Sequence, residues 1–411
     1  MRVGVVGLGY VGLPLAVAFA EHGHEVLGVD IDEGRVEELR AGRSGLAHVP
    51  DERLAAQGDR LSCSADYVTL AGAEAVVVAV PTPLDAERRP DLGPLSSAAS
   101  ALGGVLGEGM LVSVESTTYP GCTRELVAPL LEERSGLRAG EGFNLVFSPE
   151  RLSVGRPEHT IENIPKVVGG VSDACRERGV ELFGAVCETV VPVASLEAAE
   201  ATKLLENAFR FVNVSFANEF SLLCERLGID AGEVIDAAAT KPFGFMRFDP
   251  GPGAGGHCLP VDSAYLAWRA REAGADPKLL EAAIEVDRRM PEACAERVAR
   301  ALGGDLEAAA LLVVGVTYKP GIADLRESPA LRLLELLAER GADVSYHDPL
   351  IAELPALGLG SVPLRDGVAA ARAVVLATPH PGLDLDLIRE RAERVVDLRG
   401  VLRRDPVGAA R

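Results

Sequence analysis

The stretch Gly7-Leu8-Gly9-Tyr10-Val11-Gly12 decides the fold of the first part of this 411-residue chain. Residues 2–6 before it read as a buried strand, residues 13–22 after it as a helix, and residues 25–30 as a second strand. A G-x-G-x-x-G turn between a strand and a helix leaves the backbone bare, so that a pyrophosphate can approach the helix N-terminus. The sequence therefore predicts a βαβ unit that binds a dinucleotide.

Asp30 indicates which dinucleotide binds. It ends the second predicted strand, 18 residues after Gly12, where a carboxylate accepts hydrogen bonds from a ribose 2′-hydroxyl and repels a 2′-phosphate. We therefore expect NAD rather than NADP. A glycine-rich turn without a ligand is the alternative, but the two strands and the acid together favour a cofactor site. The residues expected to bind NAD are Gly7, Gly9, Tyr10, Val11, Gly12 and Asp30.

Strand-like and helix-like segments alternate on both sides of a long helical region. Strands that alternate with helices predict mostly parallel, doubly wound sheets. From residue 195 to Gly228 no internal glycine or proline interrupts one expected long helix. A loop rich in glycine and proline follows, and helix-like sequence then resumes from residue 261 to about 302. The remaining predicted strands cover residues 75–80, 110–114, 145–147, 166–168, 311–316, 343–347, 373–377 and 394–398.

These patterns predict the fold class. We expect an α/β protein with two Rossmann-like, doubly wound domains, joined by a long central helix and a helical middle domain. The expected division is residues 1–194, 195–304 and 305–411.

Composition excludes several classes of partner. The chain has 41 basic and 61 acidic residues and a net charge of -20, which would repel a phosphate backbone and anionic lipid, so we expect neither nucleic acid nor a membrane as partner. The seven cysteines form no C-x-x-C pair, which favours a reducing cytoplasm over a disulfide framework and predicts no metal site. The uncharged run of residues 3–20 has the length of a signal-peptide core, but its glycines and Pro14 read as strand, turn and helix instead.

Lysine is scarce, with five in the whole chain, so a lysine here marks chemistry that arginine does not supply. Lys203 and Asn207 lie at i and i+4 on the expected long helix and project from one face, with Glu200 and Arg210 near the same stripe. A solvated polar stripe is the alternative interpretation.

The segment from Gly251 to Asp262 is the strongest local signal. Four glycines and two prolines make a loop whose backbone can lie against a ligand, and the loop carries Cys258 with Asp262 four positions later. A cysteine at the start of a helix favours the nucleophilic thiolate. A buried, inert cysteine is the alternative, but a core thiol does not need such a loop.

Together with four more motifs, this loop resembles the UDP-glucose/GDP-mannose dehydrogenase family. The resemblance runs from residue 1 to about residue 400, and in form it is nearest to the UDP-N-acetylhexosamine 6-dehydrogenase branch. The other motifs are Glu115-Ser-Thr-Thr-Tyr-Pro-Gly121, Phe147-Ser-Pro-Glu150-Arg151, Ile164-Pro-Lys-Val-Val-Gly-Gly170 and Tyr318-Lys319-Pro-Gly-Ile-Ala-Asp324-Leu-Arg326-Glu-Ser328.

The resemblance implies a four-electron oxidation of a sugar C6 alcohol to a carboxylate, with two NAD molecules reduced. It implies that Cys258 captures the C6 aldehyde as a thiohemiacetal, which becomes a thioester and is then hydrolysed. Lys203 would stabilise oxyanions, a role that suits its compact ammonium. Asn207 and Asp262 would hold a water and assist proton removal. The residues implied to support water activation are Thr117 or Thr118 and Glu150, and those implied to contact NAD are Thr82, Thr117 and Glu150.

The resemblance also implies how the substrate and subunits are arranged. The last domain would bind the nucleotide of the sugar nucleotide, with Lys319 and Arg326 near phosphates of substrate or cofactor or at the domain junction. Arg247 would reach the substrate of a partner subunit in a homodimer. The implied setting is cytoplasmic polysaccharide biosynthesis. The residues implied to bind substrate are Glu150, Arg151, Lys203, Asn207, Arg247, Gly253, Gly255, Gly256 and Lys319.

Two departures from the family pattern bear on the sugar. Val154 stands where many UDP-glucose enzymes of the family have a second glutamate, and Cys122 stands where threonine is expected. Both weaken an assignment to glucose. Two other functions remain: a two-electron hydroxyacid dehydrogenase of the 6-phosphogluconate type, which needs no thiol, and a protein that binds NAD or a nucleotide sugar without catalysis. Cys258 distinguishes the first of these.

Overall fold

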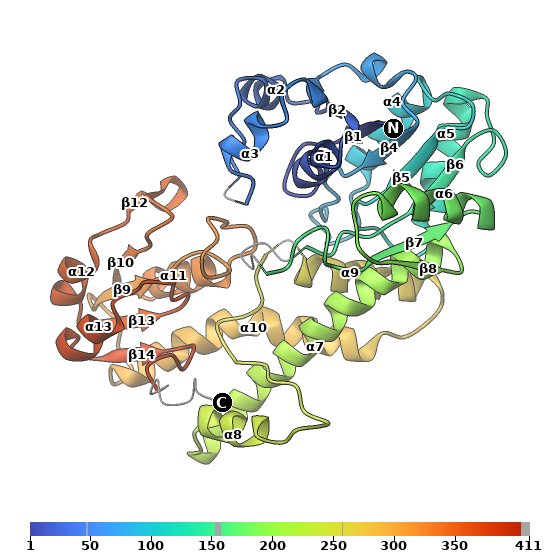
Figure 1. Ribbon diagram of the computed structural model, residues 1–411. Coiled ribbons are helices and arrows are strands. Elements are labelled where there is room, and N and C mark those ends of the chain that lie inside the picture. The colour runs from blue at the N-terminus through green and yellow to red at the C-terminus, as the bar shows by residue number, and fades with distance from the viewer. Residues whose placement is uncertain (47, 153–157, 257, 404–411) are drawn as a thin grey trace. The chain divides into compact units, whose positions relative to one another are not determined.

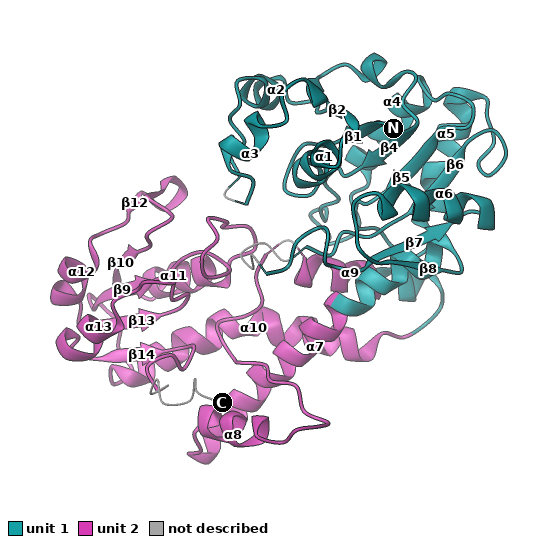
Figure 2. Ribbon diagram, in the orientation of Figure 1, with its two compact units in different colours: residues 1–206, 268–275 teal, residues 207–267, 276–411 magenta. Residues whose placement is uncertain are grey.

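The computed structural model describes residues 1–46, 48–152, 158–256 and 258–403 and divides the chain into two compact units (Figure 2). Unit 1 comprises residues 1–206 and 268–275, and unit 2 comprises residues 207–267 and 276–411. Helices α7 (Leu196–Leu227) and α9 (Leu259–Glu272) each contribute residues to both units. The expected three-domain division at residues 194 and 304 stays a prediction. Val154 lies outside the described residues.

Unit 1 is built on an eight-stranded sheet in the order β3-β2-β1-β4-β5-β6-β7-β8 (Figure 1). The first six strands are parallel and have the strand order of a dinucleotide-binding fold, whereas β7 runs antiparallel to β6. The strands are β1 (Arg2–Val6), β2 (Glu25–Val29), β3 (Leu61–Ser64), β4 (Ala75–Val78), β5 (Leu111–Val114), β6 (Asn144–Phe147), β7 (Lys166–Gly170) and β8 (Val190–Val193).

Helices cover both faces of this sheet. Helices α1 and α6 share one face, where the rings of Phe19 and Phe183 lie 6.4 Å apart within a single core. The crossovers through α4 and α5 run the opposite way along the strand order, so right-handed connections put these helices on the other face. The helices are α1 (Gly12–Glu21), α2 (Glu33–Arg40), α3 (Asp51–Ala55), α4 (Gly93–Gly103), α5 (Ala128–Ser135) and α6 (Asp173–Gly184).

Unit 2 contains a second, wholly parallel sheet in the order β10-β9-β13-β14. Alternate residues of β9 face two separate cores: Leu311 and Val313 pack with α10 and α11, and Leu312 and Val314 pack with α12 and α13. A two-stranded hairpin, β11 (Glu353–Leu354) and β12 (Leu359–Gly360), precedes α12. The other elements are β9 (Ala310–Val314), β10 (Asp343–His347), β13 (Ala373–Leu376), β14 (Val395–Asp397), α8 (Ala231–Ala239), α10 (Lys278–Ala301), α11 (Pro329–Glu339), α12 (Leu364–Ala370) and α13 (Leu385–Arg391).

The expected fold class is confirmed: both sheets are of the Rossmann type, and one helix of 32 residues links the two regions. The helix-like sequence over residues 261–302 forms two helices. It is divided into α9 and α10, because Gly274 adopts a φ of 77° and Pro277 precedes α10. None of the helices in the described part of the chain combines the length and apolar character that crossing a membrane requires.

Candidate active site

The three glycines of the first turn differ in what surrounds them. Gly7 has a φ of 89°, and a Cβ there would lie 2.5 Å from the Ala79 carbonyl oxygen. A Cβ on Gly12 would lie 1.8 Å from the Gly7 oxygen, so both positions are closed to any side chain. By contrast, no described atom lies within 4 Å of a Cβ built on Gly9. Gly7 and Gly12 therefore let the turn pack, whereas the backbone at Gly9 stays accessible at the start of α1, as pyrophosphate binding requires.

Asp30 holds this turn from the end of β2. Its carboxylate accepts the Leu8 N–H at 2.8 Å and the Asp32 N–H at 3.0 Å, and each oxygen retains capacity for a further donor such as a ribose hydroxyl. The nearby Arg35 guanidinium donates to the carbonyl oxygens of Leu8, at 3.1 and 3.2 Å, and Ser44, at 2.6 Å. Arg35 thus supports the turn itself. This arrangement fits NAD.

The other residues expected to contact NAD lie in unit 1 near strand ends, apart from two. Tyr10 is 41% exposed and stacks on His48 with ring centroids 5.4 Å apart. Thr82 is buried in the loop after β4, and Thr117 is half-buried in the loop after β5. Lys319 and Arg326, also expected near the cofactor, belong to unit 2.

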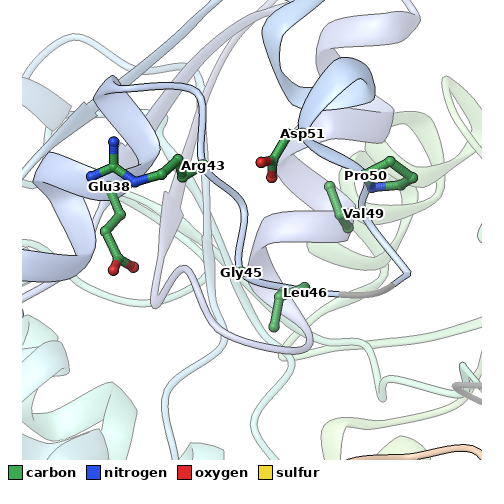
Figure 3. Close-up of a pocket in the computed structure, with 7 residues that line it drawn as sticks. All are labelled: Glu38, Arg43, Gly45, Leu46, Val49, Pro50 and Asp51. Carbon is green, nitrogen blue, oxygen red and sulfur yellow. The ribbon is translucent and has the colours of Figure 1, made fainter.

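A pocket of about 430 Å³ in unit 1 is not the expected cofactor site (Figure 3). It lies beside α2 and α3, and no residue expected to bind NAD lines it. Its lining residues are Glu38, Arg43, Gly45, Leu46, Val49, Pro50 and Asp51.

Two buried carboxylates fix the loop after β5. Glu115, at its start, pairs with Lys166 at 2.7 Å; burial raises the pKa of Glu115, and the nearby ammonium opposes that rise. At its other end Glu200 of α7 accepts hydrogen bonds from the Thr118 hydroxyl at 3.3 Å and from Gly121 N–H at 2.6 Å. The N–H and hydroxyl of Thr123 complete the set at 2.8 and 2.6 Å. Burial raises the pKa of Glu200 to about 7, against the effect of these donors.

Lys203 and Glu150 are brought together within unit 1. The Lys203 ammonium donates to the Glu150 carbonyl oxygen at 2.6 Å and lies 3.9 Å from its carboxylate, and Lys203 is 8% exposed. Arg151 binds the Glu206 carboxylate at 2.6 Å and the Pro165 carbonyl oxygen at 2.6 Å. Its guanidinium thus anchors the segment that carries Glu150, and its expected contact with substrate stays a prediction.

Unit 2 brings together the other three expected catalytic residues. The Cys258 carbonyl oxygen accepts the Asp262 N–H at 2.8 Å, which puts the exposed Cys258 at the N-terminal end of α9. The Asp262 carboxylate accepts the Asn207 side-chain amide at 2.5 Å. Both of these polar side chains are buried, at 3% and 6% exposure. Cys258 and Asp262 thus share the first turn of α9, and Asn207 binds the Asp262 carboxylate there.

The glycines before Cys258 have a structural explanation within unit 2. A Cβ on Gly255 would lie 2.7 Å from the Tyr318 Cβ, and one on Gly256 would lie 2.6 Å from the Tyr318 ring. The Gly256 N–H also donates to the Arg326 carbonyl oxygen at 3.1 Å, and Gly253 adopts a φ of 134°. Two motifs found separately in the sequence therefore pack on each other. Packing alone requires glycine at 255 and 256, whatever their contact with a sugar.

Three of the basic residues expected at the substrate or its phosphates, Arg247, Lys319 and Arg326, belong to unit 2. Arg326 pairs with Asp324 at 2.7 Å, and Arg247 contacts both Asp236 at 2.6 Å and Asp249 at 2.8 Å. Lys319 is half-buried in the loop after β9, where its carbonyl oxygen accepts the Thr317 hydroxyl at 3.0 Å.

The turn after β9 in the second sheet resembles the glycine turn after β1, but its aspartate is buried. Val316 N–H donates to Asp348 at 2.8 Å, as Leu8 N–H does to Asp30. Unlike Asp30, Asp348 is 3% exposed and contacts His380 at 3.0 Å. Burial raises the pKa of Asp348, but donors including His380 outweigh that effect and lower it. Sequence reasoning missed this repeat; its signal was an aspartate directly after a strand, as at Asp30.

A pocket of about 760 Å³ lies in unit 2 beside the carboxyl end of β14. Arg399, one of its lining residues, donates to the Ala377 carbonyl oxygen at 2.9 Å, and burial lowers the pKa of its guanidinium. Ligands of parallel sheets bind outside the carboxyl ends of strands. Sequence reasoning missed Arg399, although an arginine two residues after the last strand was the available signal.

An NAD-type turn on a parallel sheet, a lysine beside a carboxylate, and a thiol at a helix start define the class of an NAD-dependent dehydrogenase. Three consecutive domain models agree with this class: the NAD binding domain matches residues 1–187, the central domain residues 197–289, and the UDP binding domain residues 312–404. The chain belongs to the UDP-glucose/GDP-mannose dehydrogenase family.

Curated relatives and solved structures cover nearly the whole chain. The UDP-N-acetyl-D-glucosamine 6-dehydrogenase of Pseudomonas aeruginosa is 36% identical over 92% of this chain and 90% of its own. The UDP-N-acetyl-D-mannosamine dehydrogenase of Pyrococcus horikoshii is 34% identical over 99% and 97%. A solved UDP-D-ManNAc dehydrogenase from Pyrococcus horikoshii superimposes with a TM-score of 0.88 at 33% identity, covering 99% and 97% of the two chains. A UDP-glucose dehydrogenase from Pyrobaculum islandicum gives 0.89 at 32% identity, covering 97% and 94%.

Proposed function

We propose that this protein oxidises the C6 hydroxyl of a UDP-linked N-acetylhexosamine, or of UDP-glucose, to the uronic acid through a covalent intermediate on Cys258. The observation that carries the proposal is the exposed Cys258 at the N-terminal end of α9, one helical turn before Asp262, whose buried carboxylate binds Asn207. Helix N-terminal ends favour negative charge, which suits an attacking thiolate. A two-electron hydroxyacid dehydrogenase has no use for this thiol.

The reaction balances in four steps: an oxidation, a thiolate addition, a second oxidation and a hydrolysis. NAD, when bound at the turn that Gly7, Gly9 and Gly12 form, accepts a hydride in each of the two oxidations. The first oxidation removes a hydride from C6 and a proton from its hydroxyl, which gives the aldehyde. The Cys258 thiolate then adds to the aldehyde carbon, and the resulting thiohemiacetal loses a second hydride and a proton to become a thioester. Water attacks the thioester, the carbon–sulfur bond breaks, and the acid and the thiol are released.

The polar side chains are assigned by their chemistry. The Lys203 ammonium is a compact donor that stabilises the oxyanions of the addition and hydrolysis steps. The Asp262 carboxylate, oriented by the Asn207 amide, accepts a proton, directly or through a water. Glu150 and Thr118 support the water that attacks the thioester.

The nucleotide half of the substrate is assigned to unit 2. The UDP binding domain model covers residues 312–404, and the 760 Å³ pocket lies in the same unit. Arg399, which is half-buried and donates to a carbonyl oxygen at 2.9 Å, has further donors for a diphosphate. Lys319 and Arg326 are proposed as further phosphate contacts.

Stoichiometry tests the function. The protein is incubated with NAD and a panel of UDP-, dTDP- and GDP-sugars, and NADH is counted per sugar consumed. Two NADH per sugar supports the proposal. One NADH supports the two-electron alternative, and none with any sugar supports binding without catalysis.

We also propose a homodimer that works in the cytoplasm in polysaccharide biosynthesis. Phe209, Phe216 and Leu223 lie at i, i+7 and i+14 on α7, yet they are 47%, 64% and 50% exposed. An exposed apolar stripe with a seven-residue period fits a matching helix of a second copy. Light scattering tests this assembly: Phe216→Glu should convert a dimer to a monomer, and a wild-type monomer would contradict it.

A further inference from the structure

Glu200 is a fully buried charged side chain, at 0% exposure, one turn before Lys203 on α7. The sequence showed it only as part of a polar stripe, and no catalytic step proposed above uses it. A buried carboxylate needs a dense set of donors, because burial without hydrogen bonds costs several kcal/mol. The donors therefore show what this residue does.

Four donors to this carboxylate come from one short segment, residues 118–123. Gly121 N–H and Thr123 N–H donate at 2.6 and 2.8 Å. These amides lie at the start of the helical turn over residues 123–127 that leads into α5. The first amides of a helical segment lack partners within it, and a carboxylate there also meets the positive end of the helix dipole. Glu200 thus caps this helical segment from a different helix.

The same carboxylate determines how the Thr118 hydroxyl is oriented. Thr118 is 1% exposed, and its hydroxyl donates to Glu200 at 3.3 Å. A hydroxyl has a single proton, so this oxygen acts only as an acceptor toward other groups.

We propose that Glu200 is a positioning residue of the oxidation: its carboxylate fixes segment 118–123 relative to the Lys203 helix turn and makes Thr118 an acceptor for the attacking water. This proposal rests on the proposed function, in which Thr118 supports that water. Segment 118–123 begins just after β5, whose own end is held by Glu115 and Lys166. Both ends of the short loop that carries Thr117 and Thr118 are therefore tied by buried carboxylates.

Charged and titratable groups near Glu200 come from its own helix and from the capped segment. They are Glu197 on the preceding turn of α7, Arg124, and Cys122. Burial raises the pKa of Glu200 to about 7, so protonation near neutral pH would put a hydroxyl where the Gly121 amide needs an acceptor. The kcat of the wild type should therefore fall on the acid side with a midpoint near this pKa.

Glu200→Gln tests the proposal. The amide has the same shape, but its NH2 group would meet an N–H donor of the segment, so we expect kcat to fall about 10- to 100-fold, as for small misplacements of catalytic groups. The KM values for NAD and sugar nucleotide should change little, and the acid limb near pH 7 should disappear. The matched control is Glu197→Gln, three residues earlier on α7, whose carboxylate pairs with Arg124 at 2.6 Å and is partly exposed. This control should leave the kcat at high pH unchanged and keep the acid limb, with its midpoint moved to lower pH because the Glu197 charge helps to raise the pKa of Glu200.

Two further measurements keep the test decisive. Thr123→Val removes one donor and leaves the Glu200 charge, so an intermediate loss of kcat is expected even where Glu200→Gln folds poorly. Hydrogen exchange at the Gly121 and Thr123 amides should be slow in the wild type at pH 8 and much faster in Glu200→Gln.

The outcomes separate the two proposals. Unchanged kcat, pH profile and amide exchange in Glu200→Gln would overturn the role of Glu200. If the wild type oxidises no sugar nucleotide, the proposed function fails and the catalytic part of this inference fails with it. The exchange experiment then still decides whether Glu200 fixes the segment.

Discussion

The buried Glu200 carboxylate predicts an unusual dependence of stability on pH. Its pKa is raised from 4.5 to about 7 by burial, against the hydrogen bonds from Thr123 and Gly121. Between these two pH values the unfolded state binds fewer protons than the folded state, so the free energy of unfolding falls as pH rises. A difference of about 2.5 pKa units corresponds to about 3 kcal/mol. This stability should be fully present below pH 4.5 and lost as pH rises through 7.

Chemical unfolding of the wild type and of Glu200→Gln at pH 4.5 and pH 8 measures this effect. Other titrating groups, including Glu115, are common to both proteins and cancel in the difference between them. Relative to the variant, the wild type should lose about 3 kcal/mol across this range. The reasoning is refuted if that difference stays constant with pH, or if the wild type gains stability over the variant as pH rises.

Three further predictions concern the cofactor turn, a buried ion pair and the thiol. Gly9→Ala should preserve thermal stability but weaken NAD binding, because the added methyl has space in the protein but would lie where the pyrophosphate approaches the backbone. Gly12→Ala should lower both thermal stability and NAD binding, since its Cβ would lie 1.8 Å from a carbonyl oxygen. Calorimetry and fluorescence titration distinguish these cases. Lys166→Met leaves the buried Glu115 carboxylate without its ammonium and should destabilise the fold by about 3–5 kcal/mol, seen as a lower urea midpoint. Cys258→Ser should form a first-step product or a trapped adduct without turnover to acid, as followed by product chromatography.

Sequence patterns determined most of the fold because apolar runs and glycine turns are local signals. Strands β1 and β10 begin and end where the pattern predicts. Strand β3 was missed since Leu61-Ser-Cys-Ser is mostly polar, and β8 since it contains Pro192. Both lie at the edges of the sheet, where burial imposes a weaker pattern.

The candidate site was predictable where spacing along one element fixes geometry. Lys203 and Asn207 share a helix, and four positions separate Cys258 from Asp262, so their grouping follows from helix geometry. Contacts between distant segments were not predictable. The bonds of Glu200 to segment 118–123 span more than 75 positions.

The glycines at 255 and 256 also depend on a contact with a distant segment that the sequence did not predict. The sequence suggested that these glycines expose backbone to a ligand. In the structure the residue that requires them is Tyr318, which lies more than 60 positions away in the sequence and packs against them. A glycine pattern indicates that some group packs closely against the backbone, but it does not indicate which group.

The covalent role of Cys258 is the central claim, and a quenched reaction tests it most directly. The protein is mixed with NAD and the sugar nucleotide that it oxidises, stopped with acid within one turnover, digested, and analysed by mass spectrometry. The peptide that contains Cys258 should carry the mass of the uronyl thioester, and the other six cysteines should remain unmodified. Two NADH per sugar with no adduct on that peptide, together with normal turnover by Cys258→Ser, would contradict the account.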